Sequence, residues 1–386
     1  MKVTVNGQDY ILLTQCPLVG TTERYEFKTD VHEVYNGGSE ERIPGRDYAR
    51  QSMSYSVHAY RAETVGLFND LYSWLRKTYL VPQPLESQDV GNLADDFIEA
   101  DTSLVSIEVG TLILVQPLIG SLEVREVTEI GRYEVIEEEP VYIDGYRLNS
   151  AVIANDATIY PLRKCIIDGN PSISVSESMI KSLLNLRVID NFKYEIAEAP
   201  TQYKGDDLYF TPLLLDGEVV DIELMQQQNI VDGQIGQFWQ FTNWLNPKIG
   251  KNLRVLMHSK QEYMDYKKWF YRRRGMLNAF WLPSYEQNFN VVSSDSNSIT
   301  VKDENYLANR VNIAIKSNDV WTAHAITNAA TSGANKVLTL SPSPPTTTIQ
   351  RVSYLGLYRL GSDSVQFIFR GNDIIEATVP ILELSP

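Results

Sequence analysis

Histidine is the side chain best suited to proton transfer near neutral pH, and two histidines hold matching places in this chain. His58 and His258 each follow a short alternating run of residues and precede a predicted helix. They could therefore place two imidazoles at matching sites. At a junction between a strand and a helix, however, a histidine more often caps the helix or makes a hydrogen bond. We predict that role for both.

No other pattern in the sequence predicts catalysis. The chain contains no metalloprotease, nucleophile-elbow, phosphate-loop or dinucleotide-binding motif. Ser178 and Lys181 have the spacing of a catalytic serine–lysine pair, but the accompanying motifs are missing. Acids such as Asp95 and Asp96 could serve in glycoside cleavage, which needs two positioned carboxyl groups, yet any acidic protein offers such pairs. We therefore expect no enzyme activity, no cofactor and no metal site.

Arginine forms one dense basic run, Arg272, Arg273 and Arg274, at the C-terminal end of the second predicted helix. Cations at this end of a helix oppose its dipole, and Arg76 with Lys77 holds the equivalent place after the first helix. The run can end the helix and bind a neighbouring acidic segment, or it can dock onto an acidic surface of another copy. We take all five residues as candidate contacts between subunits.

Length and charge limit the class of protein. The chain has 386 residues and a net charge of −15, from 34 basic and 49 acidic residues. That length allows roughly two to four domains. The charge argues against stable binding of nucleic acid, which needs a basic face. It suits either solubility or a surface that DNA passes without adhering. Cys16 and Cys165 lie far apart and predict reduced, buried thiols.

The sequence predicts no membrane or export segment. No apolar run reaches the ~18 residues that cross a bilayer as a helix. The N-terminal residues, MKVTVNGQDYILLTQ, predict a strand and a turn rather than a charged segment before an apolar signal core. We therefore expect neither membrane insertion nor a cleaved signal.

Two stretches look like one piece of sequence used twice. One runs from His58 to Pro84 and the other from His258 to Ser284. Each continues into a helix with an aromatic stripe and then into a short apolar strand that ends at a proline, YLVP or FWLP. Repetition of a β-rich unit is typical of a symmetric building block rather than of a single-site enzyme.

The helices predict where each unit has its core. Apolar residues at spacings of three and four lay one face of the first helix, at 62–77, on a sheet. We predict that Phe68 and Leu71 are buried against the first sheet. Phe270, in the second helix at 260–274, should be buried against the second sheet.

Short alternating runs separated by Gly, Pro and Asp turns make up most of the remaining sequence and predict a mainly β protein. Both halves share one order: strands, one flanking helix, a strand ending at proline, an inserted small β module and closing strands. We predict duplicated β-sandwich or barrel units joined by a connecting helix over 176–188. The predicted division is a first unit at 1–90 and 157–178 with a module at 91–156, a connecting helix or linker at 179–194, and a second unit at 195–287 and 350–386 with a module at 288–349.

Several segments resemble one family of proteins. The block WFYRRRGMLNAFWLPS and the closing segment YRLGSDSVQFIF…EATVPILEL are similar to segments of distal-tail and tail-hub proteins of long-tailed bacteriophages. The segment FKTDVHEV…GGSEERI resembles the start of a distal-tail ring domain. The resemblance covers most of the chain in layout and implies a tail-tube-like sandwich in each unit. That family usually has one ring domain per chain, whereas here the unit is repeated.

The resemblance implies a structural virion protein of the phage tail tip, a ring-forming distal-tail or hub component of the baseplate. Such a protein joins the tail tube to the tip, lines the DNA exit channel and assembles in the host cytoplasm. Its partners would be itself, the tail tube and other tail-tip proteins, with DNA only in passage. Three copies of a two-unit chain supply six units, so we expect a homotrimer with pseudo-six-fold symmetry. A homohexamer in which one unit builds the ring is the alternative.

Two other classes of protein are open at this stage. A carbohydrate- or receptor-binding tail protein would act through its small β modules, with Trp239, Trp281 or Trp321 as stacking platforms. A peptidoglycan-degrading enzyme would need an acidic or metal-binding constellation that the sequence does not display.

Overall fold

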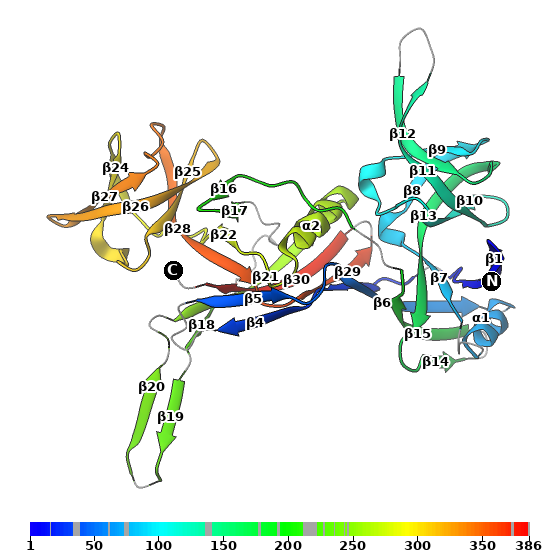
Figure 1. The fold of residues 1–386 in the computed structure, drawn as a ribbon, viewed down its shortest axis with the longest axis horizontal. Helices are drawn as coiled ribbons and strands as arrows, with labels where there is room; N and C mark the ends of the chain where they lie inside the picture. The colour runs from blue at the N-terminus through cyan, green and yellow to red at the C-terminus, as the bar shows by residue number, and fades with distance from the viewer. Residues whose placement is uncertain are drawn as a thin grey trace.

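The structure is a computed structural model that describes residues 1–15, 17–33, 39–60, 62–72, 77–135, 141–176, 179–190, 194–210, 222–226, 228–234, 236–242, 244, 247–371 and 374–384. The protein is mainly β, as predicted, with long antiparallel sheets and a helix in each half of the chain (Figure 1). Among the described residues, no helix has the length and apolar character needed to span a bilayer.

The elements of the first half form a unit and a small β module. The unit consists of β1 (Lys2–Val5), β2 (Gln8–Leu12), β3 (Thr22–Glu26), β4 (Thr29–Glu33), β5 (Glu40–Pro44), β6 (Arg50–Tyr60), α1 (Ala62–Tyr72), β7 (Tyr79–Pro82), β13 (Ala154–Ile167), β14 (Ser172–Val175) and β15 (Met179–Val188). The first module adds η1 (Pro84–Glu86), β8 (Gln88–Leu93), β9 (Phe97–Glu99), η2 (Thr102–Leu104), β10 (Leu112–Pro117), β11 (Glu123–Val135) and β12 (Val141–Leu148).

The second half repeats this order. Its unit consists of β16 (Gln202–Tyr203), β17 (Asp206–Leu208), β18 (Ile222–Met225), β19 (Gln228–Asp232), β20 (Phe238–Thr242), β21 (Lys248–Met257), α2 (Lys260–Arg273), β22 (Phe280–Pro283), β28 (Ile349–Leu360), β29 (Ser364–Gly371) and β30 (Ile374–Glu383). The second module adds β23 (Val291–Ser294), β24 (Ser298–Lys302), η3 (Asp303–Asn305), β25 (Asn312–Ser317), β26 (Val320–Ser332) and β27 (Asn335–Ser341).

The strands of the two units pair in the same pattern. In the first unit β7 lies parallel to β2 and antiparallel to β13, β13 pairs with β15, β15 with β6, and β6 with β3. In the second unit β22, β17, β28, β30, β21 and β18 take the same places with the same directions. The order of elements predicted from the sequence therefore recurs in the pairing of the strands.

The hydrogen-bond registers show which residues of the two units correspond. In the first unit Tyr79 of β7 lies opposite Cys165 of β13, and Ile167, two residues further along β13, leads through Leu186 of β15 to Met53 in β6. In the second unit Phe280 of β22 lies opposite Tyr358 of β28, and Leu360, two residues further along β28, leads through Ile381 of β30 to Lys251 in β21. Met53 and Lys251 therefore hold the same place in their units.

Each module is built onto its unit through one continuous strand. The first part of β13 pairs with β8 and β10 of the first module, and its last part pairs with β7 and β15 of the unit. In the same way β28 pairs first with β25 and then with β22 and β30. The predicted boundary between 156 and 157 thus falls inside a strand, although each module has an apolar core of its own.

The connecting helix predicted within 176–194 is wrong, because residues 179–188 form strand β15. Buried and exposed side chains alternate along this strand, with Ile180, Leu184 and Leu186 buried. A period of two is the pattern of a strand with one face on a core. Pairing with β6 over its whole length makes β15 the closing strand of the first unit, which therefore extends beyond residue 178.

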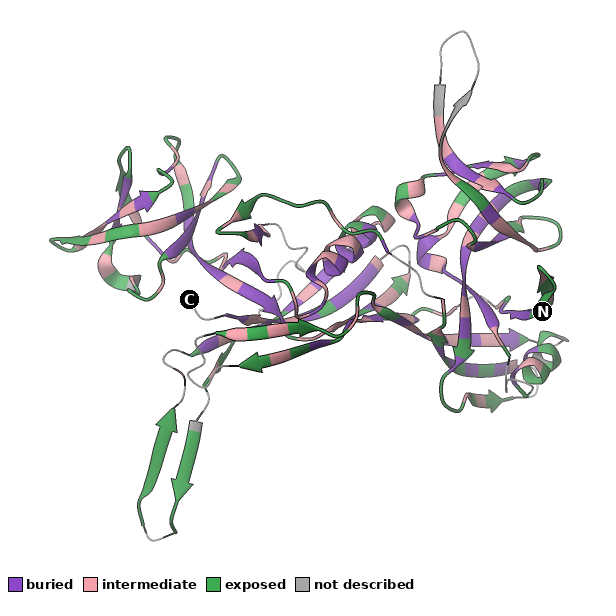
Figure 2. Ribbon diagram, viewed as in Figure 1, coloured by how far each residue is buried: buried purple, intermediate pink, exposed green. Residues whose placement is uncertain are grey.

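The two helices lie in different surroundings. Leu71 in α1 and Phe270 in α2 are buried, as predicted. Phe68 is 44% exposed, so the prediction for this residue is wrong, and Leu67 is the buried neighbour instead. The burial colouring of Figure 2 shows α2 largely covered and α1 largely exposed. One side of α1 therefore packs on its own sheet and the other faces outward.

Candidate functional site

The two units meet edge to edge, and we call this contact the joint. Strand β3 of the first unit pairs antiparallel with β29 of the second, with Tyr25 opposite Val365, so the sheets of the two units are continuous. The hairpin β4–β5 of the first unit lies along the sheet of the second (Figure 1). The joint thus brings together unlike faces of two similarly built units.

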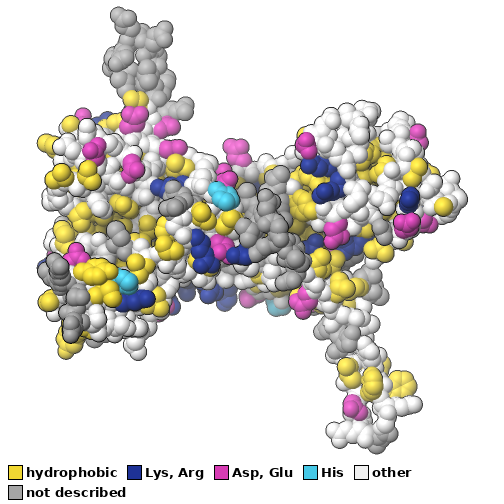
Figure 3. Space-filling view, turned by 180° about the vertical axis from the view of Figure 1, so that it is seen from behind, with side chains coloured by type: hydrophobic (Ala, Val, Ile, Leu, Met, Phe, Trp, Pro, Cys, Tyr) yellow, Lys and Arg dark blue, Asp and Glu magenta, His cyan; other side chains and the backbone are white. Residues whose placement is uncertain are grey.

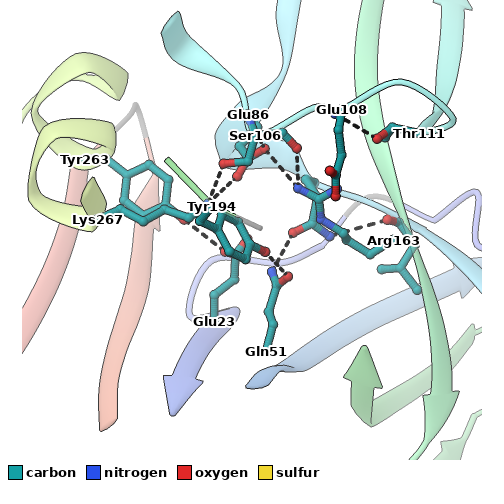
Figure 4. Close-up of polar contacts among 12 residues, drawn as sticks. Glu23, Gln51, Glu86, Ser106, Glu108, Thr111, Arg163, Tyr194, Tyr263 and Lys267 are labelled. Carbon is teal, nitrogen blue, oxygen red and sulfur yellow. Dashed lines mark hydrogen bonds and ion pairs between the residues drawn. The ribbon is translucent and has the colours of Figure 1, made fainter. Parts of the chain in front are cut away.

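A buried ion pair between the units lies at the centre of the joint. Lys267, in the middle of α2, places Nζ 2.5 Å from Oε1 of Glu86, which ends η1 in the first half. Both side chains are at most 2% exposed. The stick view of Figure 4 shows Lys267 approaching Glu86 from the opposite side of the joint.

The second oxygen of Glu86 and a loop of the first module complete the network. Oε2 of Glu86 accepts a hydrogen bond from the backbone N–H of Ser106 at 2.9 Å and lies 3.6 Å from the guanidinium of Arg163. Arg163 in turn donates to the carbonyl oxygen of Ser106 at 2.6 Å, and Lys267 donates to its hydroxyl at 3.0 Å. The Glu86 carboxylate is therefore held from two sides, as a buried charge requires.

Tyrosine rings surround the ammonium group of Lys267. Its Nζ lies 4.3 Å from the ring centre of Tyr194 and 5.0 Å from that of Tyr25, distances at which a cation is attracted to a ring face. The hydroxyls of Tyr25 and Tyr263 both donate to Oε2 of Glu23 at 3.0 Å. The joint therefore combines residues of both units, the first module and the segment that links the units.

The two buried acids of the joint differ in their electrostatics. Burial favours the neutral form of Glu86, but the charges of Lys267 and Arg163 outweigh burial and lower the pKa of Glu86. Burial dominates at Glu23 and raises its pKa, although Lys267 opposes the shift. Burial likewise lowers the pKa of Lys267 against the pull of Glu86. All three groups are enclosed within the joint.

The basic run after α2 binds acids of its own chain. Asp207 accepts hydrogen bonds from Arg272, at 2.6 and 2.9 Å, and from Arg273. Burial alone would raise the pKa of Asp207, but these two arginines hold it at about 2. Arg274 crosses the joint and donates to the carboxylate of Asp47 at 2.7 Å. Arg273 is 2% exposed, so its side chain presents almost no surface to another subunit.

The remaining candidates for subunit contact follow the first helix. Lys77 is exposed, and Arg76 lies outside the described residues. For these two residues, contact with another subunit stays a prediction.

The structure does not place the two histidines at matching points. Because Met53 corresponds to Lys251, His258 corresponds to Tyr60 of the first unit. His58 therefore lies two residues before the position that matches His258. The backbone N–H of His258 donates to Glu262 at the start of α2, which ties it to the helix cap as predicted. The Nε2 of His58 is buried without a hydrogen-bond partner among the described residues.

Other residues singled out in the sequence also have defined places. Cys165 is a buried free thiol, as predicted, and burial raises its pKa; Cys16 lies outside the described residues. Trp281 is 6% exposed and therefore offers no stacking face, whereas Trp239 is exposed on the hairpin β19–β20. Within the described ranges, no group of three or more His, Cys, Asp or Glu side chains could hold a metal ion.

Sequence reasoning missed the joint because its charged residues are far apart in the chain and isolated. Glu86, Arg163 and Lys267 belong to different elements, and none lies in a motif. Lys267 is one of two adjacent lysines, with Lys268, on a helix that carries many charges, which suggests solvent exposure rather than burial. A scan against protein-family models matches no family, and a search of curated proteins finds no matching relative.

Proposed function

We propose that the protein is a ring-forming structural component of a phage tail tip, which continues the tail tube and lets DNA pass. The observation that carries this proposal is the joint, in which β3 of one unit pairs with β29 and contacts α2 of a similarly built unit, while the hairpin β4–β5 binds β21 and β28. A contact between unlike faces repeats around a ring when its rotation closes.

The proposed ring contains three chains. Each chain contributes two units, so three copies give six units around a lumen with pseudo-six-fold symmetry. The net charge of −15 supports a lumen lined by Asp and Glu, because a negative surface repels the DNA backbone. Tail tube and other tip proteins would bind the two ends of the ring. The proposal assigns no catalytic step.

Mass photometry and negative-stain images of the purified protein test the proposal. We expect a particle of three times the 43.8 kDa of the chain, with a central hole. Six copies around one ring would replace the trimer by a hexamer. Monomers at all accessible concentrations, without rings, would contradict the proposal itself.

A DNA-retention assay tests the proposed lumen separately. A labelled duplex should migrate freely in a gel-shift experiment with the assembled ring, even at about 50 mM salt, where basic surfaces bind DNA strongly. Retention at that salt concentration would contradict an acidic channel.

A further inference from the structure

We infer that a second copy of this chain docks on the first and that the contact between chains repeats the joint within the chain. This inference rests on the proposed ring. Two faces are left outside the joint. We call β18 and the hairpin β19–β20 of the second unit the front face. We call β14, the outer side of α1 and the exposed residues of β6 and β13 in the first unit the back face.

The first observation is a pair of open sheet edges. Among the described residues, β14 pairs with β15 alone and β18 pairs with β21 alone. Both strands expose apolar side chains at these edges, including Val175, Ile222 and Leu224. An exposed apolar edge strand is a template for pairing with another chain unless something covers it.

These edges correspond to the two strands that meet in the joint. Glu23 of β3 lies opposite Met53, and Ile222 of β18 lies opposite the matching residue, Lys251. Ile173 of β14 is linked by its register through β15 to Val57 of β6. Phe367 of β29 is linked in the same way through β30 to Val255 of β21. Val57 and Val255 hold the same place in their units, so Ile173 corresponds to Phe367. Because Glu23 pairs with Phe367 inside the chain, we expect Ile222 to lie opposite Ile173 of the next chain.

The second observation is the pair of hairpins. The hairpin β4–β5 lies along the neighbouring unit, whereas β19–β20 projects from the molecule and is exposed along its length (Figures 1 and 2). Exposed apolar side chains lie along this projecting hairpin, which carries separate yellow patches in Figure 3. They are Ile230, Val231, Phe238, Trp239 and Phe241. Their exposure has a physical explanation if β19–β20 lies on the next chain as β4–β5 lies on its own.

One ion pair of the joint corresponds to two charged residues, one on the front face and one on the back face. Glu33, at the end of β4, lies 3.2 Å from Nζ of Lys248 at the start of β21. The matching residues are Asp232 at the end of β19 and Arg50 at the start of β6. Both are exposed, and they carry the same signs of charge as the pair within the chain. Asp232 of one copy is therefore suited to bind Arg50 of the next.

A second ion pair has an apolar counterpart. Glu40, the first residue of β5, binds Arg359 of β28 at 2.6 Å. The matching residues are Phe238, the first residue of β20, and Ile166 of β13. Phe238 is 66% exposed and Ile166 is 40% exposed. Two exposed apolar groups at matched positions favour contact, because their burial removes apolar surface from water.

The outer side of α1 supplies the third observation. In the joint, α2 packs against β3, and Tyr263 reaches Glu23. The corresponding helix of the first unit exposes Val65, Phe68 and Tyr72, with Phe68 and Tyr72 stacked on each other. The strand that corresponds to β3 is β18, so the exposed apolar edge of β18 from a second copy is suited to cover this side of α1.

A charge exchange tests the placement of the hairpin. Phe238→Glu alone and Ile166→Arg alone should each weaken association of the full chain ~10-fold or more, since each puts an unpaired charge into an apolar contact. The double variant recreates the Glu40–Arg359 pair between chains and should restore association to within a few-fold. Leu118→Glu, at an exposed site on neither face, is the matched control and should leave assembly unchanged. Equal weakening by the double variant and the single variants would overturn this placement.

Cross-linking tests the pairing of β14 with β18. In a Cys16→Ser background, a chain with Ile173→Cys and Ile222→Cys should oxidise to covalent oligomers of the size of the native ring, whereas either single variant should not. Val175→Cys with Ile222→Cys is the out-of-register control and should cross-link far less. If rings form but the two pairs cross-link equally or not at all, the inference falls while the proposed ring stands. If no ring forms, mass photometry shows that the proposed function has failed as well.

Discussion

The ammonium group of Lys267 lies 2.5 Å from the carboxylate of Glu86, although 181 positions separate the two residues in the chain. Lys267 belongs to the helix of the second unit, and Glu86 belongs to η1 at the start of the first module. A buried ion pair adds little net stability over an apolar contact of the same shape, but it tolerates few arrangements of its partners. We therefore expect it to set the orientation of the two units more than it strengthens either one.

Removing one partner of this pair should destabilise the protein strongly. Lys267→Met leaves the Glu86 carboxylate buried with Arg163 as its remaining cation, and we expect a loss of ~3–5 kcal/mol in the free energy of unfolding. Adding Glu86→Leu should not recover that loss, because it removes the carboxylate that lies 3.6 Å from the buried guanidinium of Arg163. Urea denaturation followed by tryptophan fluorescence measures both. Asp9→Asn removes an exposed pair with Lys2 and should leave the free energy of unfolding nearly unchanged. Similar losses at the two sites would contradict the burial of the joint.

Asp207 should make the protein sensitive to acid. Its pKa is about 2 in the folded protein against an ordinary value of 3.8, so the contribution to stability is complete above about pH 4 and disappears as the pH falls through about 2. Asp207→Asn should be less stable than the parent at about pH 6, and the difference should shrink steadily below about pH 4. Urea melts across this range measure it. A difference that stays constant down to about pH 2 would show that the arginines do not hold the carboxylate.

Two neighbouring residues of α1 should respond differently to truncation. Leu71 is 1% exposed and packs in the core of the first unit, so Leu71→Ala should cost ~2–5 kcal/mol. Phe68→Ala removes a larger side chain from the exposed side and should cost less than ~1 kcal/mol in the monomer. Thermal and urea unfolding at concentrations below assembly compare the two variants. A large loss for Phe68→Ala in the monomer would mean that this side of α1 is covered within the chain.

Two glycines also allow a paired test. A Cβ at Gly145 would collide with the carbonyl oxygen of Ile98 and lie 2.7 Å from the ring of Phe97, where β12 and β9 approach closely. Gly145→Ala should therefore destabilise the first module by ~1–3 kcal/mol. A Cβ at Gly66 in α1 meets no atom within 4 Å, and Gly66→Ala should stabilise the helix by ~0.5–1 kcal/mol. Differential scanning calorimetry resolves both changes, and equal effects would contradict the close approach at Gly145.

The sequence predicted the class of fold and the order of its elements because these depend on local pattern. The helices predicted at 62–77 and 260–274 correspond to α1 (Ala62–Tyr72) and α2 (Lys260–Arg273), and Leu71 and Phe270 are buried as expected. The segment 179–188 was predicted incorrectly because its apolar residues fit either period over so short a run. This segment forms a strand because it pairs with β6, which lies far away in the sequence.

The charged joint was not predictable in the same way. Arg272 and Arg273 were identified, but their partner Asp207 lies 65 and 66 positions before them. No local signal connects such residues, since the strand β17 that carries Asp207 is placed by its parallel pairing with β22. The same holds for Lys267, because residues of the first half, including Glu86 and Tyr25, pack over the helix α2 that carries it.

The continuous strands β13 and β28 have a mechanical consequence. A module on a flexible linker would swing freely, and a pull on it would first extend the linker. Here a pull on a module acts along a strand that is bonded sideways to its unit at several successive residues, so the load is shared by many hydrogen bonds in shear. Each module is thus a rigid lever, and a force that tilts it is transmitted directly into the sheet that carries the joint.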